Sequence, residues 1–237
     1  MATEMMYLED YLVNRPIEDT RKFLRGIYKG AYEAGAYDPF NSVNTWNWFI
    51  KYHKGTFNRA LEIGCGLGAG ILLARKCGFN IWGVDFAFIP RLWKKFKVQN
   101  YCFAAEARCL PFKDASFDMV MMPDVLEHIP EFDVLEVLQE MRRVGSKDYY
   151  VLVDLGYESK PINDRLYTHI TVREEQWWRD MVSKAGFFIK KIDKFIDGKE
   201  DNKLIKVGYA MEKYQPATPW QIEVGTFKAE RRIAGSA

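Results

Sequence analysis

The sequence is poor in the residues that bind structural zinc or cross-link small proteins. It has four cysteines and three histidines in 237 residues. No two cysteines have the Cys-x-x-Cys spacing, so a zinc site and a disulfide framework are both disfavoured. A chain of this length can bury a full apolar core without such cross-links. We therefore expect buried free thiols in a reducing cytoplasm.

The sequence also lacks long apolar runs and a charge excess of either sign. No run reaches the 18 or more apolar residues of a membrane-spanning helix. Lys and Arg number 34 and Asp and Glu 32, a net charge of +2 that argues against a nucleic-acid backbone as the main partner. Residues 1–10 hold acidic but no basic residues, unlike a secretory signal. We expect a cytoplasmic protein with no membrane span and no DNA partner.

No internal repeat is present, and the central part of the chain instead alternates short apolar runs with helical patterns. The runs are apolar at nearly every position, which is typical of parallel strands buried on both faces. We predict strands at 59–64, 80–85, 101–105, 117–122 and 149–154, and helices at 69–77, 89–97 and 131–144. This alternation predicts an α/β fold with a Rossmann-like, doubly wound, mostly parallel sheet.

After residue 154 the pattern changes. Thr171, with Glu174 three residues later, has the spacing of a capping box and predicts a helix over 171–185. Two further strands are predicted at 187–195 and 204–211, separated by a polar turn. We expect them to form an antiparallel hairpin at the edge of the sheet.

These patterns divide the chain into three parts. Residues 1–56, with predicted helices at 17–34 and 45–52, are expected to form a helical lid. Residues 57–213 form the sheet domain, and residues 214–237, which show little periodicity, are expected to be a poorly ordered tail. Aromatic residues of the first part either shape a pocket or pack onto the sheet, and we favour packing. They include Tyr28, Tyr32, Tyr37, Trp46, Trp48, Phe49 and Tyr52.

A glycine-rich turn joins the first strand of the domain to the helix that follows. Gly64, Gly66 and Gly68 would let the backbone approach a ligand, and the helix N-terminus offers free N–H groups. The spacing is GxGxG and not the GxGxxG of dinucleotide-binding proteins, because residue 69 is alanine. Asp85 ends the second strand, where a carboxylate can accept both hydroxyls of a ribose. The alternative is a tight turn that binds nothing, which Asp85 disfavours.

Five motifs follow one another in the middle of the chain. They are LEIGCGLG (61–68), VD (84–85), EARCLPF (106–112), SFDMV (116–120) and DVLEHI (124–129). In this order the sequence resembles the class I S-adenosylmethionine-dependent methyltransferases over residues 57–190. The resemblance is to the small-molecule and glycan-associated group with an LPF…FD…LEH signature. It implies S-adenosylmethionine as the cofactor.

The resemblance also implies a cofactor site along the carboxyl ends of the strands. Gly64 and Gly66 would lie against the methionine part, and Asp85 would bind the ribose hydroxyls. Glu106, where the family usually has Asp, and Ala107 would face the adenine. The full implied set is Glu62, Gly64, Cys65, Gly66, Asp85, Phe86, Glu106, Ala107 and Asp124.

Two histidines are candidates for the acceptor side. His128 would act as a general base on an acceptor hydroxyl, because imidazole titrates near neutral pH, or it would merely orient the loop. His169 would contact the acceptor or complete a metal site, with a purely structural role as the alternative. The spacing of Asp124, Glu127 and His128 could also gather the ligands of one divalent cation. Many metal-free relatives share this motif, so we expect no metal.

We therefore expect methyl transfer to an oxygen of a small molecule or saccharide unit, with nitrogen or carbon as alternative acceptor atoms. An NAD-dependent oxidoreductase is disfavoured by the glycine spacing. A non-catalytic S-adenosylmethionine-binding scaffold of the same fold is the rival from another class. The sequence leaves the identity of the acceptor and the oligomeric state open.

Overall fold

The computed structural model describes residues 6–7, 12, 15–37, 46, 57–156, 166–197, 204–213 and 223–228. Apart from Trp46, the predicted helix at 45–52 lies outside the described residues. Within the described part of the chain, no helix is long and apolar enough to cross a membrane.

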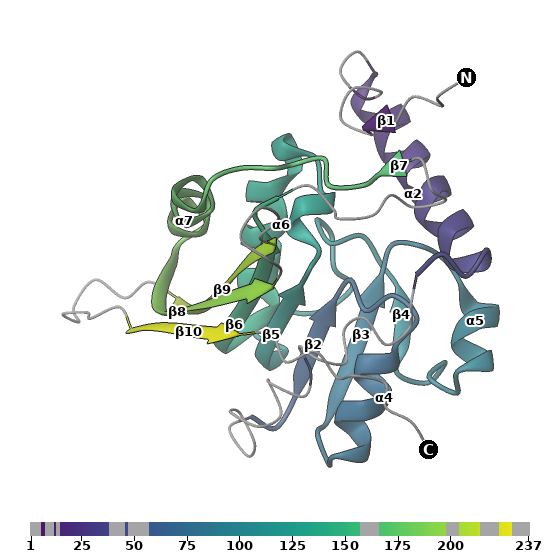
Figure 1. The fold of residues 1–237 in the computed structure, drawn as a ribbon. Coiled ribbons are helices and arrows are strands. Elements are labelled where there is room, and N and C mark those ends of the chain that lie inside the picture. The colour runs from purple at the N-terminus through teal and green to yellow at the C-terminus, as the bar shows by residue number, and fades with distance from the viewer. Residues whose placement is uncertain are drawn as a thin grey trace, which may run out of the picture.

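One mixed sheet forms the core of the molecule (Figure 1). Its strands are β2 (Ala60–Ile63), β3 (Ile81–Asp85), β4 (Cys102–Ala104), β5 (Phe117–Pro123), β6 (Gly145–Asp154), β8 (Phe187–Asp197), β9 (Leu204–Lys213) and β10 (Glu223–Lys228). Their order across the sheet is β10-β8-β9-β6-β5-β2-β3-β4. The strands from β2 to β6 pair in parallel, whereas β9 is antiparallel to both β6 and β8. The predicted antiparallel hairpin is thus confirmed.

Helices cover both faces of this sheet. They are α2 (Ile17–Glu33), α4 (Ala69–Lys76), α5 (Pro90–Lys95), α6 (Glu131–Val144) and α7 (Glu175–Lys184). In β5, Val120 and Met122 pack in the core that contains α6 and α7. Met119 and Met121 pack on the opposite face, with residues of α2, α4 and α5. Burial on both faces explains the continuous apolar runs and confirms the doubly wound α/β fold.

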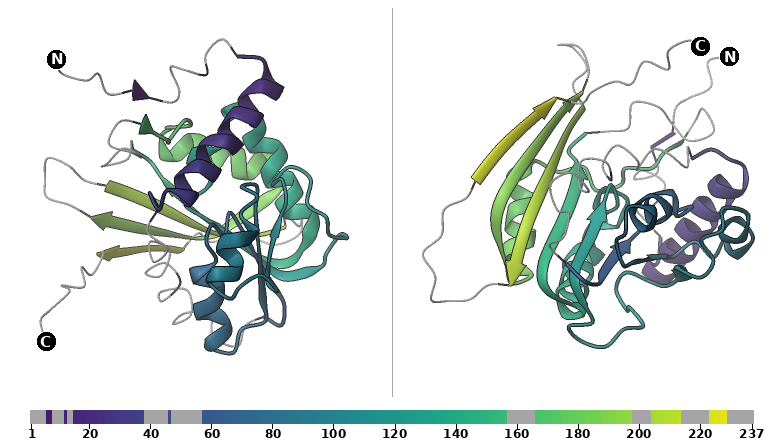
Figure 2. Two further views of the ribbon diagram at one scale, coloured as in Figure 1. Left: turned by 90° about the vertical axis from the view of Figure 1, so that its right-hand side faces the viewer. Right: turned by 90° about the horizontal axis from the view of Figure 1, so that it is seen from below.

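Two additions flank the parallel strands. The views in Figure 2 place α2 and the β8–β9–β10 strands at opposite sides of the molecule. A separate two-stranded sheet pairs β1 (Met6–Tyr7) in parallel with β7 (Leu166–Tyr167). This pairing brings the N-terminal part of the chain next to the stretch that carries Thr168 and His169.

Helix α7 begins later than the sequence predicts. Its first residue is Glu175, and its N-cap residue is Glu174 and not Thr171. The Thr171 hydroxyl donates to the carbonyl oxygen of Ile129 at 2.6 Å, and its N–H donates to that of Glu127 at 3.0 Å. Thr171 therefore anchors the preceding loop to the short helix η1 (Leu126–His128) and the residue after it, and the prediction that it caps α7 is wrong.

The C-terminal region is more regular than expected. Residues 223–228 form β10, which pairs in parallel with β8 along its whole length. Six residues are too few to give a clear periodicity in the sequence, so the backbone pairing could not be seen there. The expectation of a poorly ordered tail is wrong for this strand.

The four cysteines are free thiols, as expected, but only some of them are buried. Cys65 and Cys102 lie in the core, whereas Cys77 and Cys109 are exposed. Cys77 follows the last residue of α4 and Cys109 lies in the loop before β5, so both stand where the chain turns at the surface. The prediction of burial therefore fails for these two.

Candidate active site

A pocket opens where the parallel strands end. Together with the solvent-open space at its mouth, it measures about 910 Å³. The predicted site residues that line it are Gly64, Asp85, Phe86, Glu106, Ala107, Asp124 and His128. Among the described residues, the predicted members Glu62, Cys65, Gly66 and His169 lie outside its lining.

The glycine turn needs its glycines for steric reasons. Gly64, Gly66 and Gly68 all have positive φ angles, of 80°, 51° and 79°. A Cβ atom on Gly64 would also overlap the Val125 side chain, which lines the pocket beside it. Below the turn, the indole nitrogen of Trp93 donates to the Gly66 carbonyl oxygen at 2.8 Å. The Val125 side chain on one side and the hydrogen bond from Trp93 on the other therefore hold the turn in one conformation.

Asp85 ties the glycine turn to the end of β3. Its carboxylate accepts N–H bonds from Gly66 at 2.9 Å and from Ala87 at 2.8 Å. The hydroxyl of Tyr32 also donates to it. Burial raises the pKa of Asp85 to about 6, although these hydrogen bonds act in the opposite direction. An incoming diol would therefore compete with Tyr32 for this carboxylate.

Glu62 lies beneath the turn and not in the pocket. The side chain is 2% exposed, and its Oε1 accepts a hydrogen bond from the Trp46 indole at 3.1 Å. Burial raises the pKa of Glu62 to about 8, so the carboxyl is neutral at pH 7. This geometry fits a support for the turn better than a direct contact to a ligand.

Helix α2 closes one side of the pocket. Its residues Arg21, Leu24, Tyr28 and Tyr32 line the cavity, and Tyr37 follows from the turn after the helix. The expectation that the aromatic residues of this segment only pack onto the sheet is therefore wrong for the three tyrosines. They give the pocket an aromatic wall opposite the strand ends.

Ion pairs fasten α2 to the pocket rim. Arg21 donates two hydrogen bonds to the Asp133 carboxylate, at 2.6 and 3.1 Å. This buried partner raises the pKa of Arg21 above its usual value. Arg25 pairs with Glu106, the residue that is expected to face an adenine. Arg108 lies between the two acids, 3.3 Å from Glu106 and 3.5 Å from Asp133.

The two histidine rings lie against each other, with His128 in the pocket lining and His169 behind it. His128 belongs to the short helix η1 (Leu126–His128), and its Nδ1 donates to the carbonyl oxygen of Thr168 at 3.0 Å. The Nδ1 of His169 donates to the carbonyl oxygen of Gly156 at 2.6 Å. The ring centroids are 4.8 Å apart. Burial, followed by the nearby His169, lowers the pKa of His128 to about 3, so its ring is neutral.

Asp124 does not join this group. It directly follows β5 with a left-handed φ of 54°, and its carboxylate pairs with Lys206 of β9 at 2.7 Å. Its neighbour in the motif, Glu127, is fully buried and accepts the N–H of Asp154 at 3.2 Å. The structure thus separates Asp124 from Glu127 and His128, which the sequence spacing had grouped as metal ligands.

Comparison with known proteins agrees with this geometry. Residues 61–153 match the family model described as a methyltransferase domain. Over 112 residues the chain is 38% identical to an uncharacterized protein of Methanocaldococcus jannaschii, covering 47% of either protein. Over 144 residues it is 31% identical to the demethylmenaquinone methyltransferase of Bacillus velezensis, covering 54% of this chain and 60% of that one. The chain thus spans about half of these curated relatives or slightly more.

Solved structures share the fold of this chain. The 1,6-didemethyltoxoflavin-N1-methyltransferase of Burkholderia thailandensis, solved with 1,6-didemethyltoxoflavin and S-adenosylhomocysteine, superposes with a TM-score of 0.65. It is 17% identical, over 86% of this chain and 94% of that chain. A SAM-dependent methyltransferase from Archaeoglobus fulgidus has a TM-score of 0.56 at 19% identity, over 72% of this chain and 93% of that one. At these identities the likeness establishes the fold.

Sequence reasoning missed the charged residues that come from outside the motifs. Arg21 lies far upstream, and Lys206 lies 82 residues beyond its partner Asp124. Neither stands in a local pattern that points to the pocket. Asp133 gave a weak signal, as an acid in the first turn of α6, but such acids are common at helix starts.

Proposed function

We propose that the protein is an S-adenosylmethionine-dependent methyltransferase whose acceptor is an oxygen of a small molecule or saccharide unit. One observation carries this proposal. Four motif segments that are distant in the sequence, represented by Gly64, Asp85, Glu106 and Asp124, border a single pocket at the strand ends. Ligands of open α/β sheets bind at this position. The matched family supports methyl transfer as the reaction.

Methyl transfer requires the protein mainly to align the acceptor with the methyl group of the cofactor. The sulfonium already carries an activated methyl group, so holding the acceptor oxygen in line with it supplies much of the rate. The S–CH3 bond breaks as the O–CH3 bond forms, and S-adenosylhomocysteine leaves. A pocket closed by α2 would also exclude water from this transfer.

The proposed acceptor end lies beside His128. A carboxylate acceptor has no proton to lose, but a hydroxyl must be deprotonated. A neutral imidazole with a pKa of about 3 is a weak base, so His128 alone would serve only an acidic hydroxyl, such as a phenol or an enol. The aromatic wall of Tyr28, Tyr32 and Tyr37 suits a flat acceptor of this kind. His169 would act on the acceptor through His128, since it lies outside the lining.

The domain organisation follows from the same contacts. We propose that residues 57–213 form the catalytic unit and that residues 1–56 contribute a lid. Arg21 and Arg25, which reach acids on the rim of the unit, support this division.

The cofactor assignment is tested by calorimetric titration with S-adenosylhomocysteine. Asp85→Ala should weaken binding by about 10- to 100-fold, the scale of losing hydrogen bonds to a charged group. The matched control is Asp118→Ala. Asp118 also accepts two backbone N–H bonds, from Asn58 and Arg59 at 2.9 and 3.2 Å, but at the opposite end of the sheet. Equal affinities of the wild type and Asp85→Ala would contradict the role of Asp85.

The acceptor class is tested by transfer of a labelled methyl group to phenols, carboxylic acids and sugars. Product on an oxygen supports the proposal, whereas product only on nitrogen or carbon contradicts the choice of atom. Binding of S-adenosylhomocysteine without transfer to any class would favour the non-catalytic scaffold. Binding of NADH in place of S-adenosylhomocysteine would favour an oxidoreductase.

A further inference from the structure

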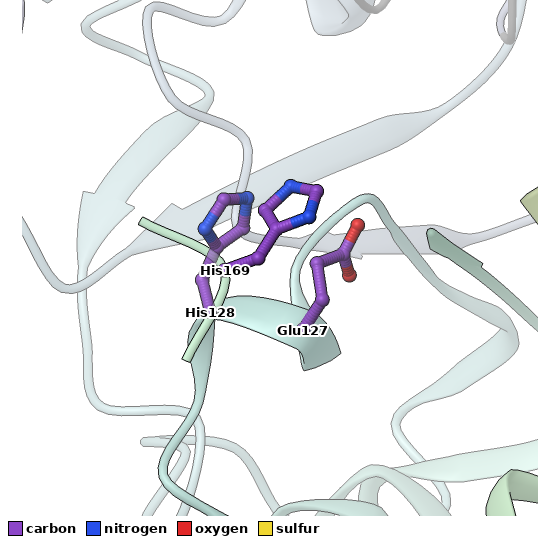
Figure 3. Close-up of side chains that lie close together, drawn as sticks. All are labelled: Glu127, His128 and His169. Carbon is purple, nitrogen blue, oxygen red and sulfur yellow. The ribbon is translucent and has the colours of Figure 1, made fainter. Parts of the chain in front are cut away.

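Three side chains with metal-binding atoms converge behind the pocket wall. Glu127 and His128 come from η1, and His169 comes from the loop after β7. Figure 3 shows the ring of His169 between the ring of His128 and the carboxylate of Glu127. One ligand atom of each side chain lies within 4.8 Å of the ligand atoms of the other two. His128 and His169 are 41 positions apart in the sequence, so this is a tertiary cluster and not a local motif.

Both imidazoles are held in the form that binds a metal. The Nδ1 atoms of His128 and His169 each donate to a backbone carbonyl, so the lone pair of each ring is on Nε2. Metal-bound histidines typically donate their other N–H to a carbonyl or a carboxylate in this way, which fixes the tautomer and the ring orientation. Here the carbonyl oxygens of Thr168 and Gly156 accept these N–H bonds.

The carboxylate of Glu127 has an oxygen that the described residues do not satisfy. The side chain has no exposed surface, and only Oε1 has a hydrogen-bond donor, the N–H of Asp154. Within the described part of the chain, Oε2 is buried without a partner. Such an oxygen costs free energy unless it is paired or coordinates a cation. In Figure 3 the carboxylate faces the ring of His169.

The acidic side chains around Glu127 also favour the binding of a cation. Asp124, Glu127 and Asp154 all lie near the ammonium group of Lys206. The ion pair of Lys206 with Asp124, at 2.7 Å, balances one of these acids. The remaining two carboxylates, Glu127 and Asp154, are buried at 0% and 3% exposure. Glu127 would supply a divalent cation bound here with a carboxylate ligand, and Asp154 would lie close to that cation.

We propose that Glu127, His128 and His169 bind one divalent transition-metal ion of the class of Mn²⁺, Fe²⁺ or Zn²⁺. Two imidazoles and one carboxylate suit these ions, whereas Mg²⁺ and Ca²⁺ prefer oxygen ligands. The set differs from the one suggested by sequence spacing, because His169 replaces Asp124. It also replaces the expectation of a metal-free site.

The cation would act on the acceptor, and this part rests on the proposed function. His128 lines the pocket, so the open coordination positions next to it can take an acceptor hydroxyl. A bound cation lowers the pKa of such a hydroxyl, whose proton then passes to solvent through the pocket mouth. The oxyanion that remains attacks the methyl group. This resolves the weakness of His128 as a base, since its lone pair is used as a ligand.

The proposal is tested by metal binding without any cofactor or acceptor. Chelator-treated protein is titrated with Mn²⁺, with calorimetry and the electron paramagnetic resonance of free Mn²⁺ as two readouts. We expect one saturable site, with binding competed by Zn²⁺. Glu127→Gln, which keeps the shape and the acceptor for Asp154, and His169→Asn should each lower the affinity by about 100-fold or more.

Asp124→Asn is the matched control. It removes the partner of Lys206 but no proposed ligand, so Mn²⁺ affinity should fall much less than in Glu127→Gln. An equal loss in Asp124→Asn and Glu127→Gln would overturn the assignment of His169 in favour of the strand-end set. Absence of a saturable site in the wild type would overturn the proposal outright.

Titration with S-adenosylhomocysteine separates this result from the proposed function. Glu127→Gln that binds S-adenosylhomocysteine as the wild type does is folded, so its loss of Mn²⁺ reports the metal site. Wild type that binds S-adenosylhomocysteine but no Mn²⁺ refutes the metal site and leaves the methyltransferase proposal standing. Wild type that binds Mn²⁺ but no S-adenosylhomocysteine supports the metal site and contradicts the methyltransferase proposal.

Discussion

The parallel strands and the elements packed around them contribute to the pocket in different ways. The strands present their residues at their carboxyl ends or directly after them, as Asp85 and Gly64 do. The surrounding elements reach in over long sequence distances, with Tyr32 from α2, Lys206 from β9 and His169 from the loop after β7. Tyr32 and Lys206 meet Asp85 and Asp124 at the strand ends, and His169 meets His128 of η1. In the proposed function, the parallel half would therefore position the cofactor, and the additions would adjust access to it and hold the acceptor.

The largest effect is expected where the strand-end geometry itself is broken. Gly64→Ala puts a Cβ at a φ of 80° and into the side chain of Val125. The left-handed conformation alone costs about 1–3 kcal/mol, and the overlap adds to it. We expect binding of S-adenosylhomocysteine to fall below detection by calorimetry, with a lowered free energy of unfolding in urea.

Gly78→Ala is the control for this substitution. Gly78 also has a positive φ, of 89°, but no atom lies within 4 Å of the added Cβ. It should lose about 1 kcal/mol of stability and keep the affinity. If Gly64→Ala behaves in the same way as Gly78→Ala, the close contact of the turn with Val125 is unimportant.

An intermediate effect is expected where the two regions meet beneath the turn. Glu62 of β2 has a pKa of about 8 in the fold, against 4.5 when exposed. Between these pH values the folded state keeps a proton that the unfolded state has lost, so the free energy of unfolding falls as the pH rises. The slope reaches about 1.4 kcal/mol per pH unit. Glu62→Gln should remove this part of the decline.

Urea unfolding at pH 5, 6, 7 and 8 measures this difference. Glu136→Gln is the control, because that side chain is 55% exposed and should follow the wild-type pH dependence. Parallel curves for the wild type and Glu62→Gln would mean that Glu62 is ionised in the fold.

The smallest effect is expected from helix α2. Tyr32→Phe removes the hydroxyl that donates to Asp85 and that a ribose would have to displace. Affinity for S-adenosylhomocysteine should rise by about 2- to 10-fold, the scale of one net hydrogen bond. Tyr28→Phe is the control on the same helix, since its hydroxyl points to the carbonyl of Thr168. A weaker affinity of Tyr32→Phe would show that the hydroxyl supports the ligand and does not compete with it.

The sequence predicted the region whose signals are local. The strands of the parallel half are continuous apolar runs, and α6 was predicted with its observed bounds, because one face of residues 131–144 is apolar. The glycine turn and Asp85 also follow from residues close in the sequence. These features need no knowledge of distant contacts.

The rest depends on contacts that no local pattern encodes. Thr171 and Glu174 have the spacing of a helix cap, yet a tertiary hydrogen bond to Ile129 uses the threonine. Glu62 belongs to the matched motif but points away from the pocket, where Trp46 meets it. The partnership of His169 with Glu127 and His128 requires the loop after β7 to return to η1. Each is set by packing across the sheet.

The hydrogen bond from the Trp93 indole to Gly66 gives the molecule an optical probe of its own. The ring is 3% exposed and lies directly under the glycine turn. The emission of a tryptophan depends on the field and the hydrogen bonding at its ring. Any ligand that displaces the Gly66 carbonyl or changes the charge on neighbouring Asp85 therefore alters the fluorescence of the native protein. Events at the turn can be followed in real time without a label.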